Sequence, residues 1–119
     1  MNIQEIAERL VTLCRKADWE TAQTELYAAD AVSIEAQASP AFAKETKGLP
    51  AIIAKGRQFN AMVETIHSLT VTDALVADDS FVCKMTLDAT MKGQGRMQMS
   101  ELCVYDVKDG KIVAEQFHP

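Results

Sequence analysis

The fold is decided by the last stretch of the chain, Glu101-Leu-Cys-Val-Tyr-Asp-Val-Lys-Asp109-Gly110-Lys-Ile-Val-Ala-Glu-Gln-Phe-His118-Pro119. It predicts two antiparallel strands joined at Asp109-Gly110, a dipeptide typical of two-residue hairpin turns. Pairing counted outward from that turn sets Val107 against Ile112 and ends with Glu101 against His118. Because side chains alternate across a strand, one face then carries Val107, Ile112, Tyr105, Ala114, Cys103, Gln116, Glu101 and His118. A few polar groups on an otherwise apolar sheet face are typical of a small-molecule pocket.

Length and composition indicate one domain, residues 1–119, with its own core. The net charge is −5, and no basic stripe is present, which argues against binding to nucleic acid or to anionic membrane surfaces. No apolar run reaches the roughly 20 residues that span a bilayer, and the N-terminus has no signal-peptide pattern. Cys14, Cys83 and Cys103 are odd in number and widely spaced. We therefore expect reduced, buried thiols in a cytoplasmic protein.

The order of elements predicts an α+β fold. Apolar residues recur at helical spacing from Ile3 to Cys14, with Asn2 and Glu5 as a capping box. Asp18 caps a shorter helix that ends near residues 29–30, a strand follows at 32–36, and residues 38–47 form a loop. A third helix begins at residues 48–50 and extends to Ile66. The strands expected after it are 67–77, 81–91, 97–107 and 111–118, which gives helices packed on one face of a curved antiparallel sheet.

The turn between residues 92 and 96 decides which side chains join Glu101 on its face. A three-residue loop at 93–95 places Phe81, Cys83, Met85 and Leu87 there. A two- or four-residue loop places Lys84, Thr86 and Asp88 there instead, with Asp88 directly across from Glu101. A one-residue slip exchanges the two faces. We favour the second register because it gathers polar residues from three strands on one side.

That register leaves the other face of the sheet too apolar to meet water. Helices can cover one side of the sheet, so a second copy of the chain is expected to cover the other. The apolar residues expected there are Phe81, Met85, Leu87, Leu102, Val104, Val113 and Phe117. The sequence therefore predicts a homodimer through the outer sheet face.

The chain resembles the SnoaL-like members of the nuclear-transport-factor-2-like superfamily. The resemblance is carried by the terminal hairpin, by Ile66-His67-Ser68, by Leu75-Val-Ala-Asp78 and by Leu87-Asp88-Ala-Thr90. It implies a cone-shaped half-barrel whose three N-terminal helices close over a deep pocket, usually dimerised through the outer sheet. Family enzymes include polyketide cyclases, ketosteroid isomerases, dehydratases and epoxide hydrolases, which use Asp, His or Tyr and usually need no cofactor. Several members carry an acidic residue near the end of the last strand. Here that stretch reads Glu115-Gln-Phe-His118-Pro119, so a catalytic Asp does not carry over.

Candidate site residues follow from the predicted face. Glu101 and Asp88 are candidate acid–base carboxyls, because a dry pocket and a facing carboxyl both raise a carboxyl pKa. The competing interpretation places both at the sheet rim, paired with Lys84 or Arg96. His118 is a candidate proton shuttle, although chain ends often fray, and Tyr105 is a candidate hydrogen-bond donor. The candidate substrate-binding residues are His67, Gln116, Tyr27 and Trp19, each with an ordinary packing or capping role as the alternative.

Three functions remain open on this reading. The first is a cofactor-independent acid–base enzyme, acting on a small apolar carbonyl or hydroxyl compound with Glu101 or Asp88 as base and Tyr105 or His118 as donor. The second is a non-catalytic module that binds a small molecule in the same cavity. The third is a dimerisation domain whose pocket is filled by its own side chains. No spacing of His, Cys or Asp predicts a metal site, and no dinucleotide or phosphate loop is present.

Overall fold

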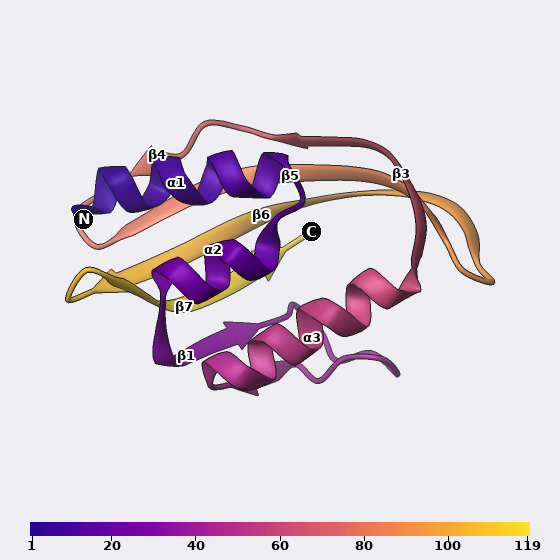
Figure 1. Ribbon diagram of the computed structural model, residues 1–119, viewed down its shortest axis with the longest axis horizontal. Helices are drawn as coiled ribbons and strands as arrows, with labels where there is room; N and C mark the ends of the chain where they lie inside the picture. The colour runs from indigo at the N-terminus through magenta and orange to yellow at the C-terminus, as the bar shows by residue number, and fades with distance from the viewer.

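A computed structural model describes the whole chain, residues 1–119. Three helices lie on one side of a single sheet (Figure 1). None of the helices has the length and apolar character needed to cross a lipid bilayer. The elements in chain order are α1 (Ile3–Arg15), α2 (Trp19–Leu26), β1 (Tyr27–Ile34), β2 (Glu45–Lys47), α3 (Leu49–Met62), β3 (Val63–Val71), β4 (Leu75–Val76), β5 (Ser80–Met91), β6 (Gly95–Lys108) and β7 (Lys111–His118).

The sheet has seven strands in the order β2-β1-β7-β6-β5-β3, with β4 paired to β5. Neighbouring strands run antiparallel except for β1 and β7, which run parallel. Its edge strands β2 and β3 do not pair with each other, so the sheet curves around the helices without closing. The predicted α+β class, with three helices on a curved and mainly antiparallel sheet, is confirmed.

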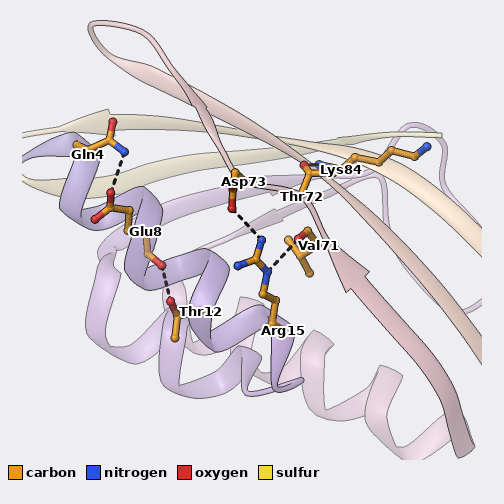
Figure 2. A network of polar contacts seen from close by, with 8 residues as sticks. All are labelled: Gln4, Glu8, Thr12, Arg15, Val71, Thr72, Asp73 and Lys84. Carbon is orange, nitrogen blue, oxygen red and sulfur yellow. Dashed lines mark hydrogen bonds and ion pairs between the residues drawn. The ribbon is translucent and has the colours of Figure 1, made fainter.

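Helix α1 forms as the sequence predicts. The Asn2 side chain accepts from the Glu5 backbone, and the Glu5 side chain accepts from the Asn2 backbone, both at 2.9 Å. Its apolar stripe, including Ile6 and Leu10, is buried in the core. At the other end of the helix, Arg15 donates to the carbonyl of Val71, the last residue of β3, at 3.0 Å, and Figure 2 shows the guanidinium also reaching the Asp73 carboxylate just beyond the strand. The helix is thereby held against the sheet at its C-terminal end.

The boundaries of the other helices differ from the prediction. Asp18 stands at the start of α2, but its carboxylate accepts from the Thr21 hydroxyl at 2.7 Å and caps no backbone group. Helix α3 ends at Met62 and not at Ile66. The residues that follow it include β-branched Val63 and Thr65, which favour a strand, so β3 begins earlier than predicted.

The terminal hairpin contains a bulge that the sequence did not reveal. Asp109 and Gly110 have φ of 53° and 75°, as the predicted two-residue turn requires. Val107 pairs with Ile112, but Asp106 pairs with Ala114, because β7 carries one extra residue at that point. The backbone N–H of Val107 is free to donate to the Asp79 carbonyl at 2.8 Å. Beyond the bulge, every side chain of β7 lies on the face opposite to the one predicted.

The central hairpin has a three-residue loop and therefore the face assignment that was not favoured from the sequence, but the loop lies at residues 92–94 and not at 93–95. Met91 pairs with Gly95 around a three-residue loop, which sets Met85 across from Glu101. Asp88 instead pairs with Gln98 on the opposite face, so the prediction that Asp88 faces Glu101 is wrong. The reason is packing: Phe81, Cys83 and Leu87 are at most 4% exposed in the core, where polar Lys84 and Asp88 have no place.

This register also changes the basis of the predicted homodimer. Phe81 and Leu87 are buried, and Phe117 lines the internal cavity, so none of them forms an apolar outer face. The outer face instead carries polar pairs, such as Thr86 with Ser100 at 2.9 Å, beside Leu102, which is 48% exposed. The homodimer stays a prediction, with a smaller apolar surface to support it.

Candidate functional site

A cavity of about 360 Å³ lies between the helices and the sheet. Its volume falls in the roughly 300–1,000 Å³ range of small-molecule sites. The wall contains six of the seven aromatic side chains of the chain, three carboxyl groups and one ammonium. Its aromatic members are Trp19, Tyr27, Phe42, Phe59, Tyr105 and Phe117, and its charged members are Glu35, Lys55, Glu101 and Glu115.

Glu101 lies on β6 and lines the cavity beside its cross-strand partner Met85. The carboxyl forms no hydrogen bond and no ion pair within the protein. Its pKa is raised from the ordinary 4.5 to about 7, chiefly by burial and also by the nearby carboxylates of Glu35 and Glu115, against the opposing effect of Lys55. A carboxyl with such a pKa exchanges protons readily near neutrality.

Glu115 lies on β7 across from Tyr105 and is 4% exposed. Its two carboxyl oxygens are both occupied. The Tyr27 hydroxyl donates to one, and the Ser33 hydroxyl donates to the other at 2.6 Å. Burial raises the pKa of Glu115, while the hydrogen bonds from Ser33 and Tyr27 oppose the shift. The parallel pairing of β1 with β7 brings these three residues together, although Tyr27 and Glu115 are far apart in the sequence.

Lys55 of α3 connects the buried carboxyl to the outer part of the cavity. Its ammonium donates to the Ser33 hydroxyl at 2.5 Å and to Glu35 at 3.1 Å. The side chains of Lys55 and Glu35 are 14% and 28% exposed, so this ion pair lies nearer to solvent than Glu115. A continuous chain of hydrogen bonds thus runs from Glu35 through Lys55 and Ser33 to Glu115.

Tyr105 contributes a hydroxyl that nothing in the protein uses. The side chain is 4% exposed and its ring stacks on Phe81, with centroids 4.8 Å apart. The hydroxyl forms no hydrogen bond within the chain, and the residue lines the cavity. Burial raises the pKa of Tyr105, so the phenol stays protonated at neutral pH and can donate. This group is placed to bind an oxygen of a molecule in the cavity.

The structure brings together four of the eight residues predicted for the site. Glu101, Tyr105, Tyr27 and Trp19 line the cavity. Trp19 packs edge-on against Phe59, with ring centroids 6.4 Å apart, so it forms part of the apolar wall.

The other four predicted residues lie outside the cavity. Asp88 forms an ion pair with Arg96 at 2.9 Å, the competing interpretation that the sequence had offered. His67 is exposed on β3 with its Nε2 2.7 Å from the Thr90 hydroxyl. Gln116 and His118 are exposed on the outer face because the bulge in β7 reverses their direction. None of the four reaches Glu101.

Four residues of the cavity network were not expected from the sequence: Glu115, Lys55, Ser33 and Glu35. Glu115 stood in the stretch where relatives carry an acidic residue, and that was the available signal. The assumed register placed it on the outer face. Lys55 had no distinguishing signal, because a lysine on a helix is usually solvated.

No three side chains of His, Cys, Asp or Glu are grouped closely enough to hold a metal ion. The cavity contains carboxylates but no histidine. The ionisable groups of its wall include the carboxyl, phenol and ammonium groups described above.

Comparison with known proteins supplies the family. A family model of the SnoaL-like domain matches residues 1–118. The chain belongs to the SnoaL-like family. A Mesorhizobium loti structure provisionally assigned as a SnoaL-like polyketide cyclase is 32% identical over the full length of both chains, with a TM-score of 0.92. No curated protein sequence matches this SnoaL-like protein.

More distant structures share the fold alone. A Bacillus subtilis protein provisionally assigned as an isomerase is 22% identical, with a TM-score of 0.76 over 98% of this chain and 88% of its own. A Catenulispora acidiphila protein with a ketosteroid isomerase-like fold, in complex with trimethylamine, is 19% identical. Its TM-score is 0.74 over 100% of this chain and 87% of its own.

Proposed function

We propose that this SnoaL-like protein is a cofactor-independent acid–base enzyme of the isomerase, cyclase or dehydratase type. Its substrate is a small, largely apolar compound with a carbonyl or hydroxyl group. The observation that carries the proposal is the unpaired carboxyl of Glu101, whose pKa is about 7, in a cavity of about 360 Å³. A base with a pKa near the working pH is the most effective for proton transfer.

In the proposed mechanism, Glu101 removes a proton from a carbon activated by the substrate carbonyl. The electron pair of the broken C–H bond moves toward the carbonyl oxygen, and the Tyr105 hydroxyl stabilises the resulting enolate by donating a hydrogen bond. Protonated Glu101 then returns the proton to another carbon in an isomerisation, or protonates a departing hydroxyl in an elimination of water. In a cyclisation, the enolate carbon attacks a second carbonyl of the same molecule, and protonated Glu101 gives its proton to the alkoxide that forms.

The positions of these two groups limit the substrate. Glu101 and Tyr105 lie on the same face of β6, four residues and therefore about 13 Å apart along the strand. Extended Glu and Tyr side chains are long enough to span part of that distance. A substrate in contact with both has its reacting carbon several bonds from its oxygen, as in a conjugated enone.

The first chemical step can be tested before the substrate is known. Small ketones and conjugated enones are incubated with the protein in D2O, and exchange of carbon-bound hydrogen for deuterium is followed by NMR. We expect Glu101→Gln to slow enzyme-dependent exchange by about 100-fold or more. Asp88→Asn is the matched control, because Asp88 lies outside the cavity, and should retain the wild-type rate.

The two outcomes separate the competing functions. Exchange at the wild-type rate in Glu101→Gln would remove the proposed base. Saturable binding of ketones without any exchange would identify a non-catalytic binding module. The self-filled dimerisation domain is disfavoured because the cavity volume of about 360 Å³ leaves room for a ligand larger than benzene.

We further propose a homodimer across the outer face of β5, β6 and β7. Exposed Leu102 and half-buried Val104 support it, because apolar side chains next to polar pairs are typical of interfaces. Sedimentation analysis of Leu102→Lys tests it: a dimer that the substitution converts to monomer supports the proposal, and a wild-type monomer refutes it.

A further inference from the structure

The cavity wall has more carboxyl groups than basic groups. The wall carries the carboxyl groups of Glu35, Glu101 and Glu115, and Lys55 is its one basic residue. Lys55 is already paired with Glu35 at 3.1 Å. Glu115 is satisfied by two hydroxyl donors. The remaining carboxyl, Glu101, has no counter-ion.

The surroundings of Glu101 favour a cation in that role. Six aromatic side chains line the cavity, and the faces of aromatic rings attract positive charge. The Phe117 ring already has a positive charge over it, because the Lys55 ammonium lies 5.6 Å from its centroid. The net charge of −5 on the chain also attracts cations from solution.

A second, independent observation points to a ligand in the same cavity. The Tyr105 side chain is 4% exposed, lines the cavity and has a hydroxyl with no partner in the chain. A buried phenol is ordinarily hydrogen-bonded. No fully buried polar side-chain atom of the chain lacks a partner, so the Tyr105 hydroxyl is open to the cavity and is available to an oxygen of a bound molecule.

We propose that the cavity binds an organic ammonium ion, with Glu101 as counter-ion and an oxygen of the same ligand accepting from Tyr105. The apolar body of the ligand lies against the aromatic wall. The proposal rests on the proposed function in taking this cavity as the substrate site, and it narrows the substrate to an amino ketone or amino alcohol.

The inference is tested by binding, without any turnover. The probe is benzyltrimethylammonium, which is small enough for the cavity, and its uncharged carbon isostere is neopentylbenzene. Both are titrated by NMR at pH 6 and pH 8. An ordinary apolar pocket binds neopentylbenzene more tightly, because removing water from a hydrocarbon costs far less free energy than removing it from a cation. We expect the opposite preference here: at pH 8, benzyltrimethylammonium should bind about tenfold more tightly than neopentylbenzene.

The pH dependence has a defined sign. Glu101 faces Glu35 beyond β1, Glu115 on β7 and Lys55 on α3, with neutral Met85 across from it on β5. A cation lowers the pKa of Glu101, so its binding releases a proton. Affinity for the cation should therefore rise by up to about tenfold from pH 6 to pH 8.

Two variants complete the test. Glu101→Gln should lose both the preference for the cation and its pH dependence, whereas Glu64→Gln, the same change at an exposed position of β3, should retain them. Equal or tighter binding of neopentylbenzene would overturn the inference, as would no binding of the cation, or unchanged cation affinity in Glu101→Gln. None of these results would remove the acid–base function, which fails instead if Glu101→Gln retains hydrogen exchange.

Discussion

Replacing Glu101 with Gln should stabilise the protein at alkaline pH while leaving it little changed at acid pH. Gln has nearly the same shape as Glu but cannot ionise, and no partner of the carboxyl is lost. In the native protein, burial raises the pKa of Glu101 from 4.5 to about 7. The folded state therefore binds this proton more tightly than the unfolded state does.

The size of the effect follows from that shift. At about 1.4 kcal/mol per unit of pKa, the difference between 4.5 and about 7 corresponds to roughly 3 kcal/mol. Glu101 keeps some contact with solvent, so about 2 kcal/mol is the realistic expectation. Because the folded pKa is the higher one, the stabilising contribution is complete below pH 4.5 and is lost as pH rises through about 7.

The assay is urea unfolding of the wild type and Glu101→Gln at pH 4.5 and pH 8. Other groups titrate over this range, and the difference between the two proteins isolates the contribution of Glu101. We expect the variant to gain about 2 kcal/mol on the wild type between the two pH values. Glu64→Gln should show no such gain in the free energy of unfolding over the wild type between the two pH values. An equal free-energy difference at both pH values would refute the reasoning, because it would mean that Glu101 is solvated.

Three further predictions concern the surroundings of the site. Tyr27→Phe removes a buried donor to Glu115 and should lower the free energy of urea unfolding at pH 8 by about 2 kcal/mol. Tyr105→Phe removes a hydroxyl without a partner and should lower it much less. Equal losses of stability in the two variants would contradict the hydrogen-bond assignment. Gly110→Ala should cost roughly 1–2 kcal/mol in thermal or urea unfolding, because its φ of 75° strains any residue with a Cβ atom. His118→Gln should leave deuterium exchange of ketones unchanged, since the imidazole is exposed on the outer face; a large loss of rate would show that it reaches the substrate.

The sequence predicted most of the elements and their order because those depend on local signals, but not β2, which lies in the predicted loop 38–47. The capping box at Asn2 and the turn at Asp109-Gly110 both formed as expected. The class of fold follows from these elements and from the spacing of apolar residues.

The faces of the strands were harder to predict because they depend on register. One extra residue in β7 exchanged Gln116 and His118 for Glu115 and Phe117 on the cavity wall. That residue leaves no trace in the pattern, since Ile112, Val113 and Ala114 are all apolar. In the central hairpin, the register that collects polar residues on one face was favoured, and it placed Asp88 across from Glu101. The actual register is determined by the burial of Phe81 and Leu87.

The residues around Glu115 come from segments distant in the sequence. Ser33 and Tyr27 reach it through the parallel pairing of β1 and β7, and Lys55 reaches Ser33 from a helix. Such contacts follow from tertiary structure and have no signature in local spacing. Glu101 and Tyr105 were predictable because they share one strand.

The central claim is that Glu101 presents an unpaired carboxyl to the cavity and titrates near neutrality. The most direct measurement is an NMR titration of the Glu side-chain carboxyl carbons, with the Glu101 signal assigned by its absence in Glu101→Gln. We predict a pKa of about 7 for this group. A pKa near the ordinary 4.5 would place the carboxyl in water and contradict the proposed base.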